Sequence, residues 1–178
     1  LVYTPAGAIV TNVDADHLDQ WGTEDAYVAA FARFVAGVEE FVVLDADDPA
    51  TRDLSVHVRP GTQIWSAGFD DGARVRGTDL AVDGSTTSFS VLLDDVPLVD
   101  VRLAVPGRHY ALDALLALAA GIALGHDATP LAAGLGAYTG AARRMQPLGE
   151  AGGVRVYDSY AHHPTEIAAD IAAARAIA

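Results

Sequence analysis

The first third of the chain alternates short apolar runs with stretches in which apolar residues recur every three or four positions. Residues 8–13 form a short run rich in β-branched residues and residues 41–44 an apolar run, which predicts two buried strands. Residues 23–38 have helical spacing, with Thr23 placed to cap the helix. A short helix is expected to begin near Pro49. Strand, helix, strand and helix in this order predict a parallel α/β sheet.

The pattern changes between residues 63 and 105. Four short runs rich in β-branched and aromatic residues are separated by Gly, Asp and Ser turns, which predicts a small antiparallel sheet. A long apolar helix is expected after the Pro-Gly turn at residues 106–107. A further helix is expected at residues 128–138, with Thr129 as its cap and Pro130 at its first position.

A glycine-rich stretch at residues 140–153 indicates a domain boundary. Beyond it, residues 154–158 predict a strand, and Pro164 opens a last helix in which Glu166 completes the capping arrangement. We therefore expect one domain at residues 1–142 and the beginning of a second at residues 143–178.

Composition narrows the range of functions. Hydrophobic residues make up 51% and charged residues 20% of the chain, as in folded proteins. The net charge of −13 argues against binding to nucleic acid or an anionic membrane. Cysteine is absent, which rules out disulfides and thiolate metal sites and fits a cytoplasmic protein. Lysine is absent too, so these residues hold no P-loop.

The turn after the first expected strand is crowded with Asp14, Asp16, His17 and Asp19. Ligands of parallel sheets bind at the carboxyl ends of strands, so this turn is well placed for a site. On the alternative interpretation, Asp16 caps a helix and His17 faces solvent. If a metal binds here, the carboxylates suit Mg²⁺, whereas a histidine ligand is more usual for Zn²⁺ or Mn²⁺.

Two arginine-containing turns are candidates for phosphate binding. His109 follows Arg108 at the start of the long apolar helix, where backbone N–H groups favour anions. The Pro-Gly turn alone could explain this segment, and Asp113 suits the helix dipole without any function. Arg143 and Arg144 lie on a glycine-flanked loop and could bind phosphate bidentately, or could be a solvated surface pair.

The segment "YDSYAHHPTEI" places His162 and His163 directly before Pro164. It is either a polar loop that opens a helix or the edge of a site. Adjacent loop histidines usually point in different directions, so one of the two is expected to line a cleft.

Taken in order, the segments "TPAGAIVTNVDADHLDQWG", "LDADDP", "VPGRHYALDALLALA", "GAARRM" and "YDSYAHHPTEI" resemble the Mur ligase family over nearly the whole chain. The resemblance is strongest to members that join L-alanine to UDP-N-acetylmuramate with ATP and Mg²⁺. It implies that residues 1–142 are the second half of a nucleotide-binding central domain, and that the remainder opens a Rossmann-like domain. The P-loop is then expected before Leu1, and the chain alone is expected to be inactive.

The resemblance also implies roles for individual residues. In the family, ATP phosphorylates the muramate carboxylate, the amino group of alanine attacks the acyl phosphate, and phosphate leaves. Positioning and charge stabilisation then account for most of the catalysis. The matching positions are a metal ligand (His17), a muramate-side residue (Asn12), nucleotide-binding residues (His109, Asp113, Arg144 and Asp158) and the substrate loop (Tyr160, His162 and His163), with Arg144, His162 and His163 closest to the chemistry.

One departure from the family pattern affects base recognition. The family usually has His-Asn-x-x-Asn where this chain has His109, Tyr110 and Asp113. An amide can both donate to and accept from adenine, whereas an ionised carboxylate only accepts. Three alternatives stay open: a ligase that recycles murein tripeptide, a non-catalytic nucleotide-binding module, and a His/Asp metal hydrolase.

Overall fold

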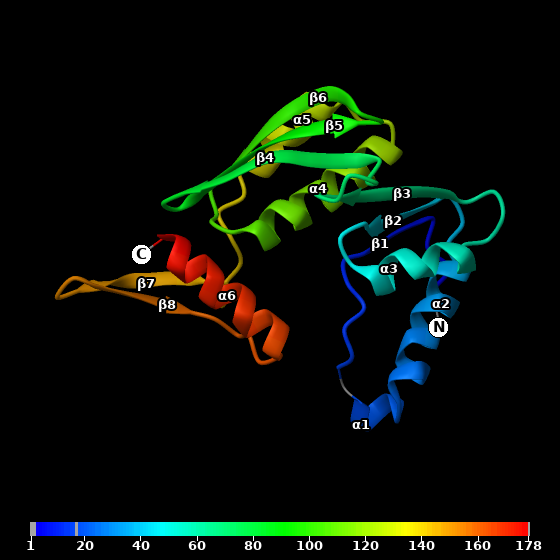
Figure 1. Ribbon diagram of the computed structural model, residues 1–178, viewed down its shortest axis with the longest axis horizontal. Helices are drawn as coiled ribbons and strands as arrows, with labels where there is room; N and C mark the ends of the chain where they lie inside the picture. Colours follow the sequence, from blue (N-terminus) through cyan, green and yellow to red (C-terminus); the bar gives the residue numbers. More distant parts are fainter. Residues whose placement is uncertain (1–2, 17, 178) are drawn as a thin grey trace.

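The computed structural model describes residues 3–16 and 18–177 as an α/β chain with one six-stranded and one two-stranded sheet (Figure 1). The strands are β1 (Gly7–Val10), β2 (Phe41–Asp45), β3 (Gln63–Gly68), β4 (Val75–Asp83), β5 (Thr86–Leu93), β6 (Val96–Leu103), β7 (Gln146–Ala151) and β8 (Val154–Asp158). The helices are α1 (Leu18–Trp21), α2 (Glu24–Ala36), α3 (Pro49–Asp53), the 3₁₀ helix η1 (Leu54–His57), α4 (Arg108–Ala123), α5 (Ala128–Gly136) and α6 (Pro164–Ile177). None of these helices is long and apolar enough to cross a bilayer.

The large sheet has the strand order β1-β2-β3-β4-β5-β6. Strands β1 to β4 pair in parallel, and β4 to β6 pair antiparallel. The predicted α/β class, with a mostly parallel sheet and a small antiparallel one, is confirmed. The detail differs at residues 63–68, because β3 pairs in parallel with β2 and the antiparallel strands extend the same sheet. The separate small antiparallel sheet is the β7–β8 hairpin.

Strand β2 is buried on both faces and separates two cores. Phe41 and Val43 belong to the core under α4 and α5, whereas Val42 and Leu44 belong to the core under α2 and η1. A strand covered by helices on both faces reads as a continuous apolar run, which is why this run predicts a strand so clearly. The carboxyl end of β2 is therefore fixed by packing.

The C-terminal part consists of the β7–β8 hairpin with α6 beside it (Figure 1). It follows a linker, residues 137–145, which joins α5 to β7. In this linker Gly140, Arg143 and Met145 have positive φ angles of 100°, 60° and 49°. Glycine adopts this region without strain, but Arg143 and Met145 do so at a cost. The linker thus has a defined, bent course.

Local signals predicted some helix starts correctly and others wrongly. Thr23 caps α2, and its side chain accepts a hydrogen bond from the backbone N–H of Ala26 at 3.2 Å. Helix α5 was predicted, but its cap was wrong, because the helix begins at Ala128 with Asp127 as its N-cap and Thr129 lies inside the first turn. Strand β7 was not predicted, because its sequence shows no alternation of apolar and polar residues. In the structure the strand is almost wholly exposed.

Candidate functional site

The carboxyl end of β1 meets the start of α6, although the two are about 150 residues apart in sequence. A cavity of about 180 Å³ lies between them. Its lining residues come from the two parts of the chain: Asn12, Asp14, Asp16, Tyr27, His163, Thr165 and Glu166. The structure therefore brings the predicted residues Asn12 and His163 to one pocket, at the sheet edge where parallel folds bind ligands.

Asp14 makes the direct contact across this pocket. One carboxylate oxygen accepts a hydrogen bond of 2.6 Å from the hydroxyl of Thr165 and lies 3.5 Å from Nδ1 of His163. The backbone N–H of Thr165 also lies 3.4 Å from Nδ1 of His163. These contacts orient the His163 ring from both sides of the cleft.

The predicted metal ligand His17 lies outside the described residues. Within residues 3–16 and 18–177, no three His, Asp or Glu side chains converge as a metal site requires. Asn12 and Asp14 do offer the oxygen donors that Mg²⁺ prefers. The described residues do not complete a metal site by themselves, so the binding of Mg²⁺ stays a prediction.

The second group of candidate residues lies at the start of α4. Gly107 has φ +121°, and its backbone N–H donates a 2.9 Å hydrogen bond to the buried hydroxyl of Thr87. A Cβ at Gly107 would approach the His109 ring to 2.9 Å and the Cβ of Ala173 in α6 to 3.4 Å. Glycine is thus needed here both for the turn and for the close approach of α6.

His109 and Asp113 lie on consecutive turns of α4 and face the region where the start of α4 approaches α6. Burial lowers the pKa of His109, while the nearby carboxylates of Asp113 and Asp170 oppose that shift. Loss of surrounding water raises the pKa of Asp113, although the residue as a whole is exposed, and His109 and Arg144 oppose that shift. The pair is adjacent, but its contribution to ligand binding stays a prediction.

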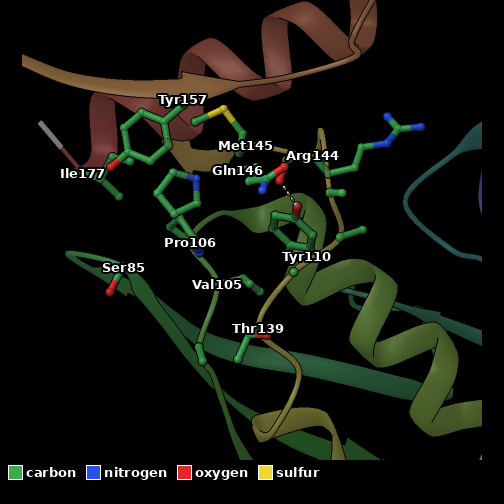
Figure 2. Close-up of a pocket in the computed structure, with 15 residues that line it drawn as sticks. Ser85, Val105, Pro106, Tyr110, Thr139, Arg144, Met145, Gln146, Tyr157 and Ile177 are labelled. Carbon is green, nitrogen blue, oxygen red and sulfur yellow. Dashed lines mark hydrogen bonds between the residues drawn. The ribbon is translucent and has the colours of Figure 1, made fainter. Parts of the chain in front are cut away.

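Tyr110 ties α4 to the linker. Its hydroxyl donates a 2.9 Å hydrogen bond to the backbone carbonyl of Arg144. Figure 2 shows Tyr110 on one side of a cavity of about 360 Å³ and Tyr157 of β8 on the opposite side, with the Arg144 side chain pointing away from both. The Tyr110 ring also packs near Tyr138, with centroids 6.4 Å apart. Aromatic walls and nearby linker carbonyls suit a planar heterocycle.

The linker arginines are held by the C-terminal part. The Arg143 guanidinium lies 4.4 Å from the Tyr160 ring centroid, and its Nε lies 4.0 Å from a carboxylate oxygen of Asp158. The backbone N–H of Tyr160 donates to the carbonyl of Arg143 at 2.7 Å. The Arg144 guanidinium pairs with Glu166 at 3.1 Å. These contacts place Asp158 and Tyr160 beside Arg143, and Glu166 beside Arg144.

The adjacent histidines point to different partners, as the sequence predicted. Nδ1 of His162 lies 3.0 Å from the carbonyl of Tyr160, whereas His163 faces Asp14. The backbone N–H groups of both histidines lie within 3.5 Å of one Glu166 oxygen. Glu166 was predicted to cap α6, which these contacts confirm; its bond to Arg144 was not predicted.

Sequence reasoning missed the roles of two residues and one contact that organise the site. Tyr110 was noted only as a departure from a family pattern, yet it anchors the linker. Thr165 was not singled out, and it bonds to Asp14. The Arg144 partner of Glu166 lies 22 positions away. Only the capping pattern of Glu166 gave a signal, because contacts between residues far apart in sequence leave no local periodicity.

Comparisons with known proteins agree with the segments quoted above. Residues 1–121 match the Mur ligase middle domain, and residues 143–178 match the Mur ligase glutamate ligase domain. Together these two matches take in most of the chain.

Individual relatives are similar over the full chain. A UDP-N-acetylmuramate–L-alanine ligase of Nocardioides sp. is 49% identical over 100% of this chain and 35% of its own length. The protein of the same name from Thermobifida fusca is 45% identical over 99% of the chain and 38% of its own length. The crystal structure of a UDP-N-acetylmuramate–alanine ligase from Thermotoga maritima superposes with a TM-score of 0.81 at 25% identity, covering 98% of this chain and 39% of that one. The chain therefore spans little more than a third of the length of these relatives.

Proposed function

This chain belongs to the Mur ligase family, and from that premise we propose that it forms the central part of an ATP-dependent ligase. The ligase joins L-alanine to UDP-N-acetylmuramate in peptidoglycan synthesis. We place this reaction in the cytoplasm, because ATP and the nucleotide-linked substrate are found there. We propose a domain boundary at residue 142, with residues 1–142 in the central ATPase domain and 143–178 opening the C-terminal ligase domain.

One geometric observation carries this proposal. The end of β1, with Asn12 and Asp14, faces the His162–His163 loop across a single cleft. The two halves of a ligase site come from different domains and must meet for an acyl phosphate and an amine to react. The names of the relatives that are 49% and 45% identical favour alanine as the amino acid.

The proposed reaction has two steps. The muramate carboxylate attacks the γ-phosphorus of ATP, which yields an acyl phosphate and ADP. The neutral amine of L-alanine then attacks the acyl carbon, loses a proton, and expels phosphate as the amide forms. Charge accumulates on phosphoryl oxygens in both steps, so fixed positive groups and N–H donors lower the barriers.

Each part of the cleft has a proposed task. The nucleoside lies near His109, Asp113 and Asp158, next to the Tyr110 cavity. Arg144 binds the transferring phosphate with its charged, planar donors. The muramate and the alanine lie near Asn12 and near the loop that contains Tyr160, His162 and His163.

The magnesium is proposed to arrive with ATP. It supplies neutralisation of the phosphate charge when bound. His17 is the proposed protein ligand, and Asn12 and Asp14 are nearby oxygen donors that line the cavity at the end of β1. The chain's own contribution is to keep this edge of the sheet polar and to orient His163 through Asp14.

The test uses the full-length protein that carries this chain. With ATP, Mg²⁺ and UDP-N-acetylmuramate, phosphate release is expected only when L-alanine is added. Release with the murein tripeptide but not with L-alanine would favour the recycling ligase, and no release with either would favour a non-catalytic module. A gene with no Gly-x-x-Gly-Lys-Thr segment upstream of Leu1 would also contradict the proposal.

A matched pair of variants ties the assay to the site. His17→Ala should lower L-alanine-dependent phosphate release by orders of magnitude, because a metal ligand is lost. His126→Ala, at an exposed position next to the cap of α5, should leave the rate within about twofold, as for surface substitutions away from a site. Equal activity of His17→Ala and the parent would remove His17 from the metal site.

A further inference from the structure

The two carboxylate oxygens of Glu166 contact different parts of the cleft. One oxygen, Oε1, accepts a 3.1 Å hydrogen bond from Nη1 of Arg144. The other, Oε2, accepts from the backbone N–H groups of His162 at 3.2 Å and His163 at 3.5 Å. A helix cap needs only the second set of contacts, so the bond to Arg144 calls for its own explanation.

The cap fixes where Oε1 points. Helix α6 begins at Pro164, which has no N–H, and the glutamate two positions later reaches back to the N–H groups that precede the helix. Because Oε2 is held by two backbone donors, the carboxylate plane is set by the helix start. Oε1 is therefore presented to the linker in one orientation.

The Arg144 backbone is equally well fixed, but its side chain is not. The residues on either side have positive φ angles, and Tyr110 holds the Arg144 carbonyl. The side chain itself is 51% exposed. A long side chain with that exposure samples many rotamers unless a partner selects one, and immobilising it costs conformational entropy. Glu166 is the partner that selects the rotamer.

We propose that Glu166 is a positioning residue that holds Arg144 ready for a nucleotide phosphate and, with its other oxygen, holds the His162–His163 loop. This inference rests on the proposed function, since it takes Arg144 as the phosphate-binding group. One carboxylate thereby supports both the phosphate end and the amino-acid end of the cleft.

Donor counting explains how Arg144 can serve Glu166 and a phosphate together. A guanidinium has five N–H donors in a planar fork. Glu166 uses a donor on Nη1, and four remain, enough for a bidentate phosphate contact. Glu166 therefore orients the group without consuming its binding capacity.

The charge state of Glu166 is consistent with this role. The hydrogen bond from Arg144 lowers the pKa of Glu166, and the backbone N–H of His162 lowers it further. The carboxylate is thus ionised at neutral pH and can act on both partners.

The main test is Glu166→Gln in the full-length protein, because this change separates the two contacts. The amide oxygen can still accept from His162 and His163, but the NH₂ group turned to Arg144 is a donor facing a donor. The KM for ATP should rise by about three- to tenfold, as expected for loss of an exposed to half-exposed charged pair, while the KM for L-alanine stays within about twofold. Glu166→Ala removes both contacts and should raise both KM values.

Two controls separate positioning from general damage. Asp94→Asn removes the charge from the exposed ion pair between Arg74, just before β4, and Asp94, in the β5–β6 turn, and should leave both KM values unchanged. In an Arg144→Ala background, Glu166→Gln should have no further effect on the KM for ATP, because its partner is gone.

The inference is overturned if Glu166→Gln leaves ATP binding unchanged, or if its effect persists without Arg144. The Kd for ATP, measured by calorimetry, gives the same comparison without turnover. A parent protein that binds ATP but releases no phosphate with L-alanine refutes the proposed function only, and the Kd of Glu166→Gln then still decides the role of Glu166. A parent that binds no ATP refutes both.

Discussion

Strands β2 and β8 are both five residues long and both end in aspartate, yet they lie in opposite surroundings. Every residue of β2 is buried, and Asp45 at its end is 3% exposed. No residue of β8 is buried, and the side chain of Asp158 is 40% exposed beside Arg143. Burial raises the pKa of Asp45 to about 6.

The buried Asp45 has a structural role, whereas we assign the exposed Asp158 to ligand recognition. Asp45 uses a carboxylate oxygen to accept the backbone N–H of Asp47 at 2.8 Å, which shapes the turn after β2. Asp158 has no such burial, and its carboxylate lies 4.0 Å from Arg143, the neighbour in sequence of Arg144, which we assign to phosphate binding. The central part therefore supplies a rigid edge, and the C-terminal part brings exposed polar groups to it.

The largest expected effect concerns the exposed side of this comparison. Arg144→Ala in the full-length protein should lower kcat/KM for ATP by about a hundredfold or more, because a charged phosphate contact is lost. The melting temperature should change little, since the side chain is half exposed. Steady-state kinetics of this variant beside Arg59→Ala, an exposed arginine far from the linker, is the measurement. Equal rates for the two variants would contradict the assignment of Arg144.

The next effect tests Asp45 through pH. A carboxyl with a pKa of about 6 in the folded state and 3.8 in the unfolded state binds more protons when folded. The free energy of unfolding should then fall as pH rises from about 4 to about 6, by up to about 3 kcal/mol. Asp45→Asn should abolish this fall and be more stable than the parent at pH 7. Urea titrations of the chain between pH 4 and 8 measure it, and parallel curves for the two proteins would show that Asp45 titrates normally.

A smaller effect compares the two strands directly. Val43 in β2 is 0% exposed, and Val156 in β8 is 48% exposed. Val43→Ala should cost about 2 kcal/mol in this chain, and Val156→Ala under about 0.5 kcal/mol. Denaturant unfolding of the 178-residue chain gives both numbers. Equal costs would mean that the hairpin shares the core of the large sheet.

The smallest effect concerns Asp113. Replacing it with asparagine restores a group that can both donate to and accept from a base, and removes a carboxyl that is costly to keep charged. Asp113→Asn should tighten ATP binding by a few-fold, about 1 kcal/mol. Calorimetry with ATP reports the change, with Asp100→Asn on β6 as the matched control. No change would mean that the base is recognised by other groups.

Much of the fold could be predicted from the sequence, because local patterns carry it. The apolar run of β2, the Thr23 cap and the Glu166 cap are all short-range signals. The α5 cap was misplaced because Asp127 and Thr129 compete at the same helix start, and both residue types are good caps. The parallel pairing of β3 depends on its neighbours in space, which periodicity does not reveal.

The site was predictable as a set of motifs but not as an arrangement. Motif resemblance indicated Asn12, Arg144 and His163, and the structure brings Asn12 and His163 to one pocket. The contact between Asp14 and Thr165 joins residues 151 positions apart, and only the tertiary fold creates it. Their contributions to ligand binding stay predictions.

The central claim is that the end of β1 and the start of α6 face each other across one cleft, and cross-linking tests it most directly. The chain has no cysteine, so Asp14→Cys combined with Thr165→Cys gives a unique pair. A short bis-maleimide should link this pair rapidly within one molecule. The control pair is Asp14→Cys with Leu148→Cys, which places the second cysteine at an exposed position of β7. Faster linking of 14 to 165 than of 14 to 148 is the predicted result, and equal or slower linking would contradict the account.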